Sequence, residues 1–173
     1  MKQEIAQLGA SILRCKAEKI IDFNSPELSL LADNMRVTLE ESGGVGLAAP
    51  QIFQSFCILI VASKPTARYP DAPEMKPVLL INPEFEILSE IIEKDWEGCL
   101  SIPSIRALVP RYEAILVDYQ DIKGNKHQLE LKGFVARVFQ HEYDHLQGLV
   151  YLDRVENNRD IISETEFFKL IAV

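Results

Sequence analysis

The pentapeptide His141-Glu142-Tyr143-Asp144-His145 constrains the fold of this chain more than any other feature. Residues four apart lie one turn apart on the same face of an α-helix, so a helix here would let both imidazoles bind one metal ion. Glu142 is rotated by only ~100° from His141, which lets its carboxylate reach a water molecule at that ion. The chain holds only 3 histidines, so a polar helix face with two unrelated histidines is the weaker interpretation.

A catalytic site of this type needs a third protein ligand, and the residues alone leave its identity open. In one protease class a third histidine follows a glycine turn; Gly148 fits that turn, but Tyr151 stands where the ligand belongs. Another class uses a glutamate about twenty residues further along, near Glu164 and Glu166. Cys99 is the remaining candidate, because a thiolate suits Zn²⁺ or Fe²⁺, although a lone cysteine is more often a small core residue.

The segment Gly43 to Gln51 is rich in glycine and alanine. Such residues let the main chain pass close to a ligand or to another backbone and leave its polar groups free for hydrogen bonds. A phosphate loop is a weak interpretation, because no Gly-Lys-Ser/Thr follows. Gln51 ends the segment as a polar residue, and the alternative to a functional role is a surface position beside a helix cap and tight turn.

The pattern of apolar residues predicts an α+β fold, with mixed or antiparallel sheets around a central metal-binding helix and with an N-terminal helix. The central helix covers Gly133–Gln147, with Gly148 as its C-cap, and Ser25 caps the first helix. The other predicted elements are the helix Pro26–Glu41, strands at Phe56–Val61, Val78–Ile81, Tyr112–Tyr119 and His127–Leu131, an exposed loop at Ser63–Pro77, and a short helix at Ser163–Leu170. A length of 173 residues predicts a single domain over residues 1–173.

Charge and composition exclude several classes of function. The formal net charge is -8, from 18 basic and 26 acidic residues, which argues against binding to DNA because phosphates require a basic patch. No apolar run approaches the length that spans a bilayer, and the first ten residues lack the core of a signal peptide. The 3 cysteines stand far apart and are odd in number, so we expect no disulfide framework and a cytoplasmic location. We also expect a monomer.

Three segments together resemble the peptide deformylase family. Gly44–Gln51 is similar to the first family motif, G-h-G-h-A-A-x-Q (h apolar), Glu97–Ser101 to the second, E-G-C-x-S, and Gln140–His145 to the third, Q-H-E-x-D-H. All three match in order, and the similarity covers most of residues 5 to 155. The proline-bearing loop Ser63–Pro77 looks longer than in compact members, and the tail lacks the long terminal helix of some members, which leaves the subtype open.

The resemblance implies an enzyme that removes the formyl group from the first methionine of new proteins and releases formate. Its substrates would be N-formyl-methionyl nascent peptides, with transient ribosome contact. One divalent ion is implied, Fe²⁺ in the cell, with Zn²⁺, Ni²⁺ or Co²⁺ in purified protein. The residues that the resemblance assigns are Cys99, His141 and His145 as metal ligands, Glu142 as general base and then acid, the side chain of Gln51 and the backbone N–H of Leu100 as oxyanion donors, and the Gly46 main chain as a support for the substrate backbone.

Helix periodicity predicts where the methionine side chain binds. Phe134 and Val138 lie seven and three residues before His141, so the three share a helix face. Val45 on the glycine-rich segment can oppose them and complete an apolar slot. The alternative is that Phe134 and Val138 simply pack in the core.

Other polar residues keep two interpretations. Arg106 and Arg137 pair either with substrate or with structural carboxylates, Asp144 orients a metal ligand or solvates its helix, and His127 is expected at the surface. A structural metal site without catalysis is the remaining alternative. Glu142 argues against it, because a structural site usually closes with a fourth ligand.

Overall fold

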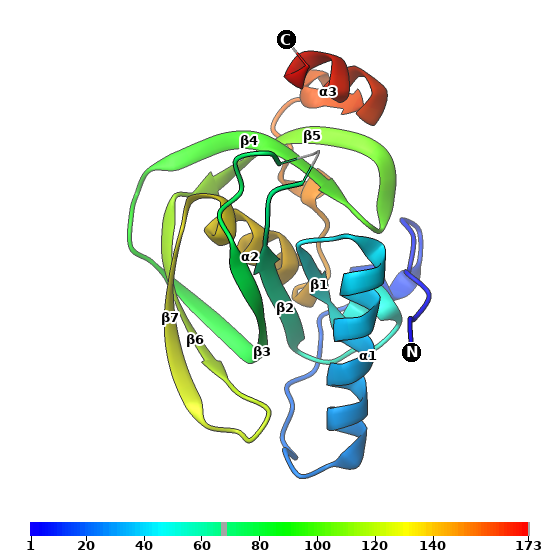
Figure 1. Ribbon diagram of the computed structural model, residues 1–173, viewed down its shortest axis with the longest axis vertical. Helices are drawn as coiled ribbons and strands as arrows, with labels where there is room; N and C mark the ends of the chain where they lie inside the picture. Colours follow the sequence, from blue (N-terminus) through cyan, green and yellow to red (C-terminus); the bar gives the residue numbers. More distant parts are fainter. Residues whose placement is uncertain (67–68, 173) are drawn as a thin grey trace.

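The computed structural model describes residues 1–66 and 69–172 and has the predicted α+β architecture, with two antiparallel sheets and few helices. The larger sheet has the strand order β1-β2-β3-β6-β7, and the smaller one the order β4-β5-β8. Helix α2 lies in the middle of the molecule between the two sheets (Figure 1). The predicted class of fold, with its central and N-terminal helices, is therefore confirmed.

The element bounds follow the chain. The larger sheet comprises β1 (Gly46–Ala48), β2 (Ile58–Ser63), β3 (Met75–Ile87), β6 (Ala114–Gln120) and β7 (Lys126–Lys132), and the smaller sheet β4 (Ile92–Cys99), β5 (Ile102–Tyr112) and β8 (Ile161–Ser163). The α-helices are α1 (Pro26–Ser42), α2 (Gly133–Leu146) and α3 (Glu164–Ile171), and single 3₁₀ turns are η1 (Ser11–Arg14), η2 (Ala49–Ile52), η3 (Tyr151–Arg154) and η4 (Asn158–Asp160).

Strand β2 explains why the larger sheet sits between two helices. Its side chains alternate between the two faces, as in any strand. Leu59 and Val61 join the apolar cluster shared with α2, whereas Ile58 and Ile60 join the cluster shared with α1. Because all four are buried, β2 reads as a continuous apolar run rather than an alternating one.

Helix α1 begins and ends as its sequence predicts. The Ser25 hydroxyl accepts a hydrogen bond from the Glu27 N–H at 3.2 Å, and Pro26 occupies the first turn, where a missing N–H costs nothing. Gly43 ends the helix with φ 65°, a left-handed conformation that glycine adopts without steric cost. The predicted range differs from the observed one only by Ser42.

The prediction missed most of the smaller sheet. Strand β4 is highly charged and largely exposed, and β5 contains two prolines, so neither reads as a strand from apolar periodicity. Strand β3 also continues beyond the predicted end at Asn82-Pro83. The register shifts between Ile81 and Glu84, and Asn82 adopts φ 50° there while its side chain bonds both backbone groups of Ile20. A bulge, rather than a strand end, accommodates the proline.

The remaining predictions differ from the structure mainly at element ends. The connection predicted at Ser63–Pro77 begins after Ser63 and ends before Met75, and its residues 67 and 68 lie outside the described residues. The short C-terminal helix is confirmed as α3, and Ser63 and Pro77 themselves belong to strands. In the described part of the chain, no helix combines the length and apolar character needed to cross a membrane.

Candidate active site

Helix α2 carries the H-E-x-x-H segment and is buried along nearly all sides. Its apolar residues Ala136, Phe139 and Leu146 pack in the main core with the larger sheet. Its polar residues are buried as well, on the side that faces the cleft and β4–β5: Arg137, Gln140, His141, Glu142, Asp144 and His145. Burial of so many polar groups is costly unless each has a partner, so their partners define the site.

Three potential metal ligands meet at the end of β4. The Cys99 sulfur lies 3.3 Å from the Nε2 of His145, and the donor atoms of Cys99, His141 and His145 all lie within 4.8 Å of one another. Burial alone raises the pKa of the Cys99 thiol, but the charges and hydrogen bonds of the two imidazoles outweigh it and hold that pKa well below its usual range. A thiolate with two imidazoles is a donor set that fits Zn²⁺ or Fe²⁺.

The two histidines are held differently. The Nδ1 of His141 lies 2.8 Å from Glu97 Oε2. Because an ionised carboxylate can only accept, Nδ1 carries a hydrogen, and in the neutral ring this leaves the lone pair of Nε2 available for a metal ion. The Tyr151 ring stacks on the His141 ring with centroids 5.7 Å apart. The Nδ1 of His145 is buried and has no hydrogen-bond partner among the described residues.

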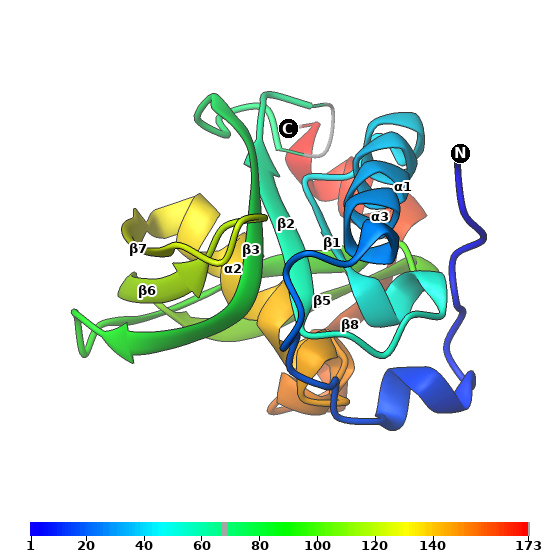
Figure 2. The same cartoon turned by 90° about the horizontal axis from the view of Figure 1, so that it is seen from below.

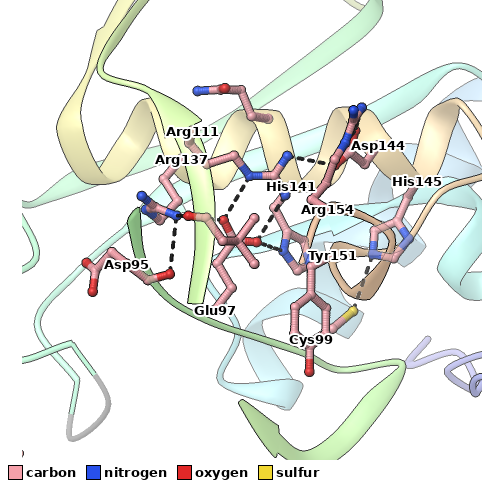
Figure 3. A network of polar contacts seen from close by, with 12 residues as sticks. Asp95, Glu97, Cys99, Arg111, Arg137, His141, Asp144, His145, Tyr151 and Arg154 are labelled. Carbon is pink, nitrogen blue, oxygen red and sulfur yellow. Dashed lines mark hydrogen bonds and ion pairs between the residues drawn. The ribbon is translucent and has the colours of Figure 1, made fainter. Parts of the chain in front are cut away.

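Glu97 is the centre of a buried charge network (Figure 3). Arg111 donates two hydrogen bonds to it, at 2.9 and 3.0 Å, and Arg137 a third at 3.0 Å. Burial raises the pKa of Glu97, but the charge of Arg111 and the contacts of His141 outweigh that effect and leave its pKa well below the usual range. The carboxylate therefore stays charged and orients His141.

Asp144 extends this network instead of solvating the helix. Its carboxylate is buried, accepts a hydrogen bond from Arg111 at 2.6 Å, and pairs with Arg154 at 2.7 Å. Since Arg111 also binds Glu97, Asp144 is linked to His141 through two intermediates. Of the two interpretations of Asp144, the structure favours the positioning one.

Glu142 is buried beside the three donors. Its Oε2 has no hydrogen-bond partner among the described residues, and burial raises its pKa to about 7. Strand β1 passes directly over it: a Cβ added at Gly46 would lie 2.8 Å from the Cγ of Glu142. Glycine at residue 46 therefore allows the strand to approach this carboxylate.

Gln51 is buried, so the predicted alternative of a surface position is wrong. Its Oε1 accepts the Ala48 N–H at 2.8 Å, which orients the amide nitrogen toward Cys99 Sγ at 3.4 Å and Ser101 Oγ at 3.3 Å. Leu100 follows Cys99 and lines the same cavity. The Gln51 amide and the Ser101 N–H each lie 3.4 Å from the sulfur, and Leu100 stands between Cys99 and Ser101 in the chain.

A cavity of about 590 Å³ opens over these groups. Its wall includes Val45, Gly46, Phe134 and Val138, the residues predicted to contact substrate. Phe134 also packs against Tyr69, with ring centroids 4.8 Å apart, and Val138 belongs to the main apolar cluster. Val138 therefore contributes both to the core and to the cavity wall.

The predicted alternatives for a third ligand lie elsewhere. The group of clustered donors among the described residues does not include Glu164 or Glu166. Glu164 accepts a hydrogen bond from Arg106 at 2.5 Å, and Glu166 pairs with Lys169 at 2.7 Å. His127 is exposed and lies 2.9 Å from Asp121, so the expectation of a surface position is correct.

Sequence reasoning missed the network around Glu97. Of the two interpretations of Arg137, the structure favours the structural one, because this side chain donates to Glu97 and to the backbone oxygens of Glu93 and Val109. Arg106 likewise pairs with Glu164 and Tyr69. The available signal was the presence of Arg111 and Arg137 within otherwise apolar segments, since a buried arginine needs a carboxylate partner.

Comparisons with known proteins agree on one family. A sequence model described as polypeptide deformylase matches residues 2–160. Peptide deformylase 2 of Nostoc sp. is 47% identical over 168 residues, covering 97% of this chain and 94% of the relative. Peptide deformylase 2 of Shewanella oneidensis is 45% identical over 150 residues, covering 87% and 82%.

Solved structures give the same result. The Met-Ala-Ser-bound class I type b peptide deformylase of Acinetobacter baumannii has a TM-score of 0.87 and 41% identity, covering 90% of this chain and 99% of that one. Peptide deformylase from Thermotoga maritima has a TM-score of 0.80 and 34% identity, covering 91% and 99%. The chain therefore belongs to the polypeptide deformylase family, metal-dependent hydrolases that remove the N-formyl group from the N-terminal methionine of new proteins.

Proposed function

We propose that residues 1–173 form one deformylase domain in which Cys99, His141 and His145 hold a single divalent ion. The observation that carries this assignment is the 3.3 Å approach of the Cys99 sulfur to His145, with His141 in the same cluster. These donors come from two elements, β4 and α2. They converge beside the buried carboxylate of Glu142, whose Oε2 has no hydrogen-bond partner among the described residues, and this supports a catalytic ion rather than a structural one.

In the proposed reaction, Glu142 moves the protons. It takes a proton from the attacking water, and it returns a proton to the leaving amine when the formyl C–N bond breaks. A pKa raised to about 7 by burial suits a group that must both accept and release a proton near neutral pH. Cys99, His141 and His145 would hold the ion, which when bound would polarise the formyl carbonyl as a Lewis acid and lower the pKa of the water.

Gln51 and Leu100 stabilise the charge that develops on the formyl oxygen. The Gln51 amide is oriented in advance by the Ala48 N–H, so its nitrogen needs no reorganisation during the reaction. The Leu100 N–H would supply the second donor. Loss of one such donor typically costs about 3 kcal/mol of transition-state stabilisation.

The methionine side chain of the substrate is proposed to lie between Val45, Phe134 and Val138. The Gly46 main chain, free of a side chain, would pair with the substrate backbone. This orientation is supported by the shared cavity wall and by the Met-Ala-Ser peptide bound to the Acinetobacter baumannii relative. Nascent N-formyl-methionyl peptides are the substrates, and we propose transient contact with the ribosome as they emerge.

We further propose Fe²⁺ as the ion in the cell, with Zn²⁺, Ni²⁺ or Co²⁺ able to replace it after purification. The donor set suits each of these ions. A cytoplasmic monomer that binds neither DNA nor membranes fits the net charge of -8 and the substrate. Anaerobic purification followed by metal analysis tests the choice of ion; zinc in a protein that releases formate at full rate would contradict iron.

Two substitutions test the residue assignments. Cys99→Ala should remove both bound metal and formate release from a formyl-Met peptide, because a cation held by two imidazoles alone lacks its anionic ligand. Glu142→Gln should keep the metal and the fold while the rate falls by about 10³-fold. Full metal occupancy in Cys99→Ala, or an active Glu142→Gln, would contradict the assignment.

A further inference from the structure

An N-terminal segment, residues 5–17, donates backbone hydrogen bonds to Gln51, Ser101 and Leu146. We call it the N-terminal strap; it runs as mostly extended chain along the outside of the molecule (Figure 2). The Ala6 N–H donates to the backbone oxygen of Gln51, and the Leu8 N–H donates to that of Ser101, each at 2.8 Å. The Ala17 N–H donates to the backbone oxygen of Leu146, also at 2.8 Å.

The acceptors of these bonds are one residue of the proposed mechanism, Gln51, and two residues that directly follow such residues, Ser101 and Leu146. Gln51 is itself a donor to the developing oxyanion, and Ser101 follows Leu100, the other donor. Leu146 follows His145 at the end of α2. A fourth bond, from the Gln7 side chain to the Leu100 backbone oxygen at 3.3 Å, adds a second contact to the Leu100–Ser101 pair.

The strap is itself fixed. Ala6, Leu13 and Ala17 are buried, so the segment cannot slide without exposing apolar surface. Its contact with the helix end is close: Gly148 has φ 75°, and a Cβ there would lie 2.8 Å from the Arg14 carbonyl carbon. Only glycine avoids both strain and overlap at this position, so the strap lies against the turn that follows the two histidines.

We infer that the N-terminal strap is a positioning element, which sets the relative placement of Gln51, Leu100 and His145. The inference rests on the proposed roles of these residues. They come from three separate elements, so their mutual distances depend on what joins the elements. A misplacement of about 1 Å can cost on the order of 100-fold in rate, which makes such a connection consequential. Ala6, Gln7 and Leu8 are therefore positioning residues that act through Gln51 and Leu100.

Single-atom backbone changes test the inference directly. Cys15 is exposed, so a synthetic peptide of residues 1–14 can be ligated to residues 15–173 to give the full chain. An ester in place of the amide at residue 6, or at residue 8, deletes one N–H and keeps every side chain. The matched control is an ester at Ala10, whose N–H donates to Gln7 within the strap at 2.9 Å.

With a formyl-Met peptide and the metal-loaded enzyme, each of the esters at residues 6 and 8 should lower kcat by about tenfold and leave KM within about twofold. The Ala10 ester should leave kcat unchanged although it lowers the melting temperature to a similar extent. Equal kcat losses in all three esters, or no loss in any, would overturn the inference. A wild-type chain that releases no formate would instead defeat the proposed function.

Two further measurements separate positioning from general stability. In a Gln51→Ala background the ester at residue 6 should lose most of its effect on kcat, because two changes in one connection are not additive. Full additivity would contradict the inference. Gln7→Met should lower kcat by about threefold, whereas Gln3→Met, which removes a bond to Met1 at 2.9 Å, should not.

Discussion

One side of α2 packs against hydrocarbon, whereas the side that faces β4 and β5 packs against charge. On the first side Phe139 is enclosed by the larger sheet, with Phe85 edge-on at 5.7 Å. On the second, Arg137, His141 and Asp144 meet Glu97 and Arg111. The apolar contacts have no preferred direction, so they bind the helix in place without fixing each atom.

The hydrogen bonds on the charged side of α2 are directional, so they fix the positions of individual atoms. A carboxylate that accepts from Arg111, Arg137 and His141 has one geometry that satisfies all of them. Removing any member leaves buried charge without a partner. Stability should therefore depend on both sides of α2, whereas metal affinity and catalysis should depend mainly on the charged one. Three experiments can break or sharpen this contrast.

The largest effect is expected from Glu97→Gln. Two buried arginines would lose their shared carboxylate, at a cost of about 3–5 kcal/mol in unfolding free energy. His141 would also lose its orienting acceptor, so metal affinity should fall by about 10–100-fold. Chelator competition and denaturant unfolding measure these quantities. Glu93→Gln, on the exposed part of β4, is the matched control and should change neither.

Phe139→Ala should lower the unfolding free energy almost as much as Glu97→Gln but should leave catalysis and metal affinity unchanged. Truncating a buried phenylalanine costs about 3–5 kcal/mol through lost burial and the cavity that remains. The charged side of α2 keeps its contacts, so kcat and metal affinity per folded molecule should stay at the wild-type level. Unfolding curves and formate release on the same sample test this. A tenfold loss of kcat in the folded protein would show that the two sides are not separable.

The smallest effect concerns Cys57, in the apolar cluster beneath α2. Burial raises the pKa of this thiol to about 11, above its ordinary value of 9.0. The folded state therefore keeps the proton while the unfolded chain loses it, and stability falls as the pH rises from about 9 to 11. In reductant, Cys57→Val should reduce that decline. Cys15→Ala, at an exposed thiol, should not.

The central helix and its two histidines were predictable because the whole pattern lies within one regular element. The third candidate ligand was not, since Cys99, Glu164 and Glu166 remain alternatives until strand β4 is placed. Residue spacing alone cannot bring distant segments of the chain together; here the family resemblance supplied what periodicity could not. The clustering of Cys99 with the histidines agrees with that implied set.

The smaller sheet was missed for a physical reason. In β4 the residues Glu93, Lys94 and Asp95 are exposed, so the strand forms through pairing with β5 rather than through burial of its side chains. In β5, Pro103 and Pro110 make the sequence pattern resemble that of a loop rather than a strand. The charge network was missed for the same reason, because Glu97 and Arg111 meet only when these two strands pair.

Gly46 limits which side chains can stand beside Glu142. A single methyl group there would displace the carboxylate of Glu142, even though no chemically reactive atom would have been removed. At Gly43, by contrast, an added Cβ would meet nothing within 4 Å. Gly46→Ala should therefore inactivate the enzyme much as the loss of Glu142 would, although the substitution adds a methyl group and removes no reactive group.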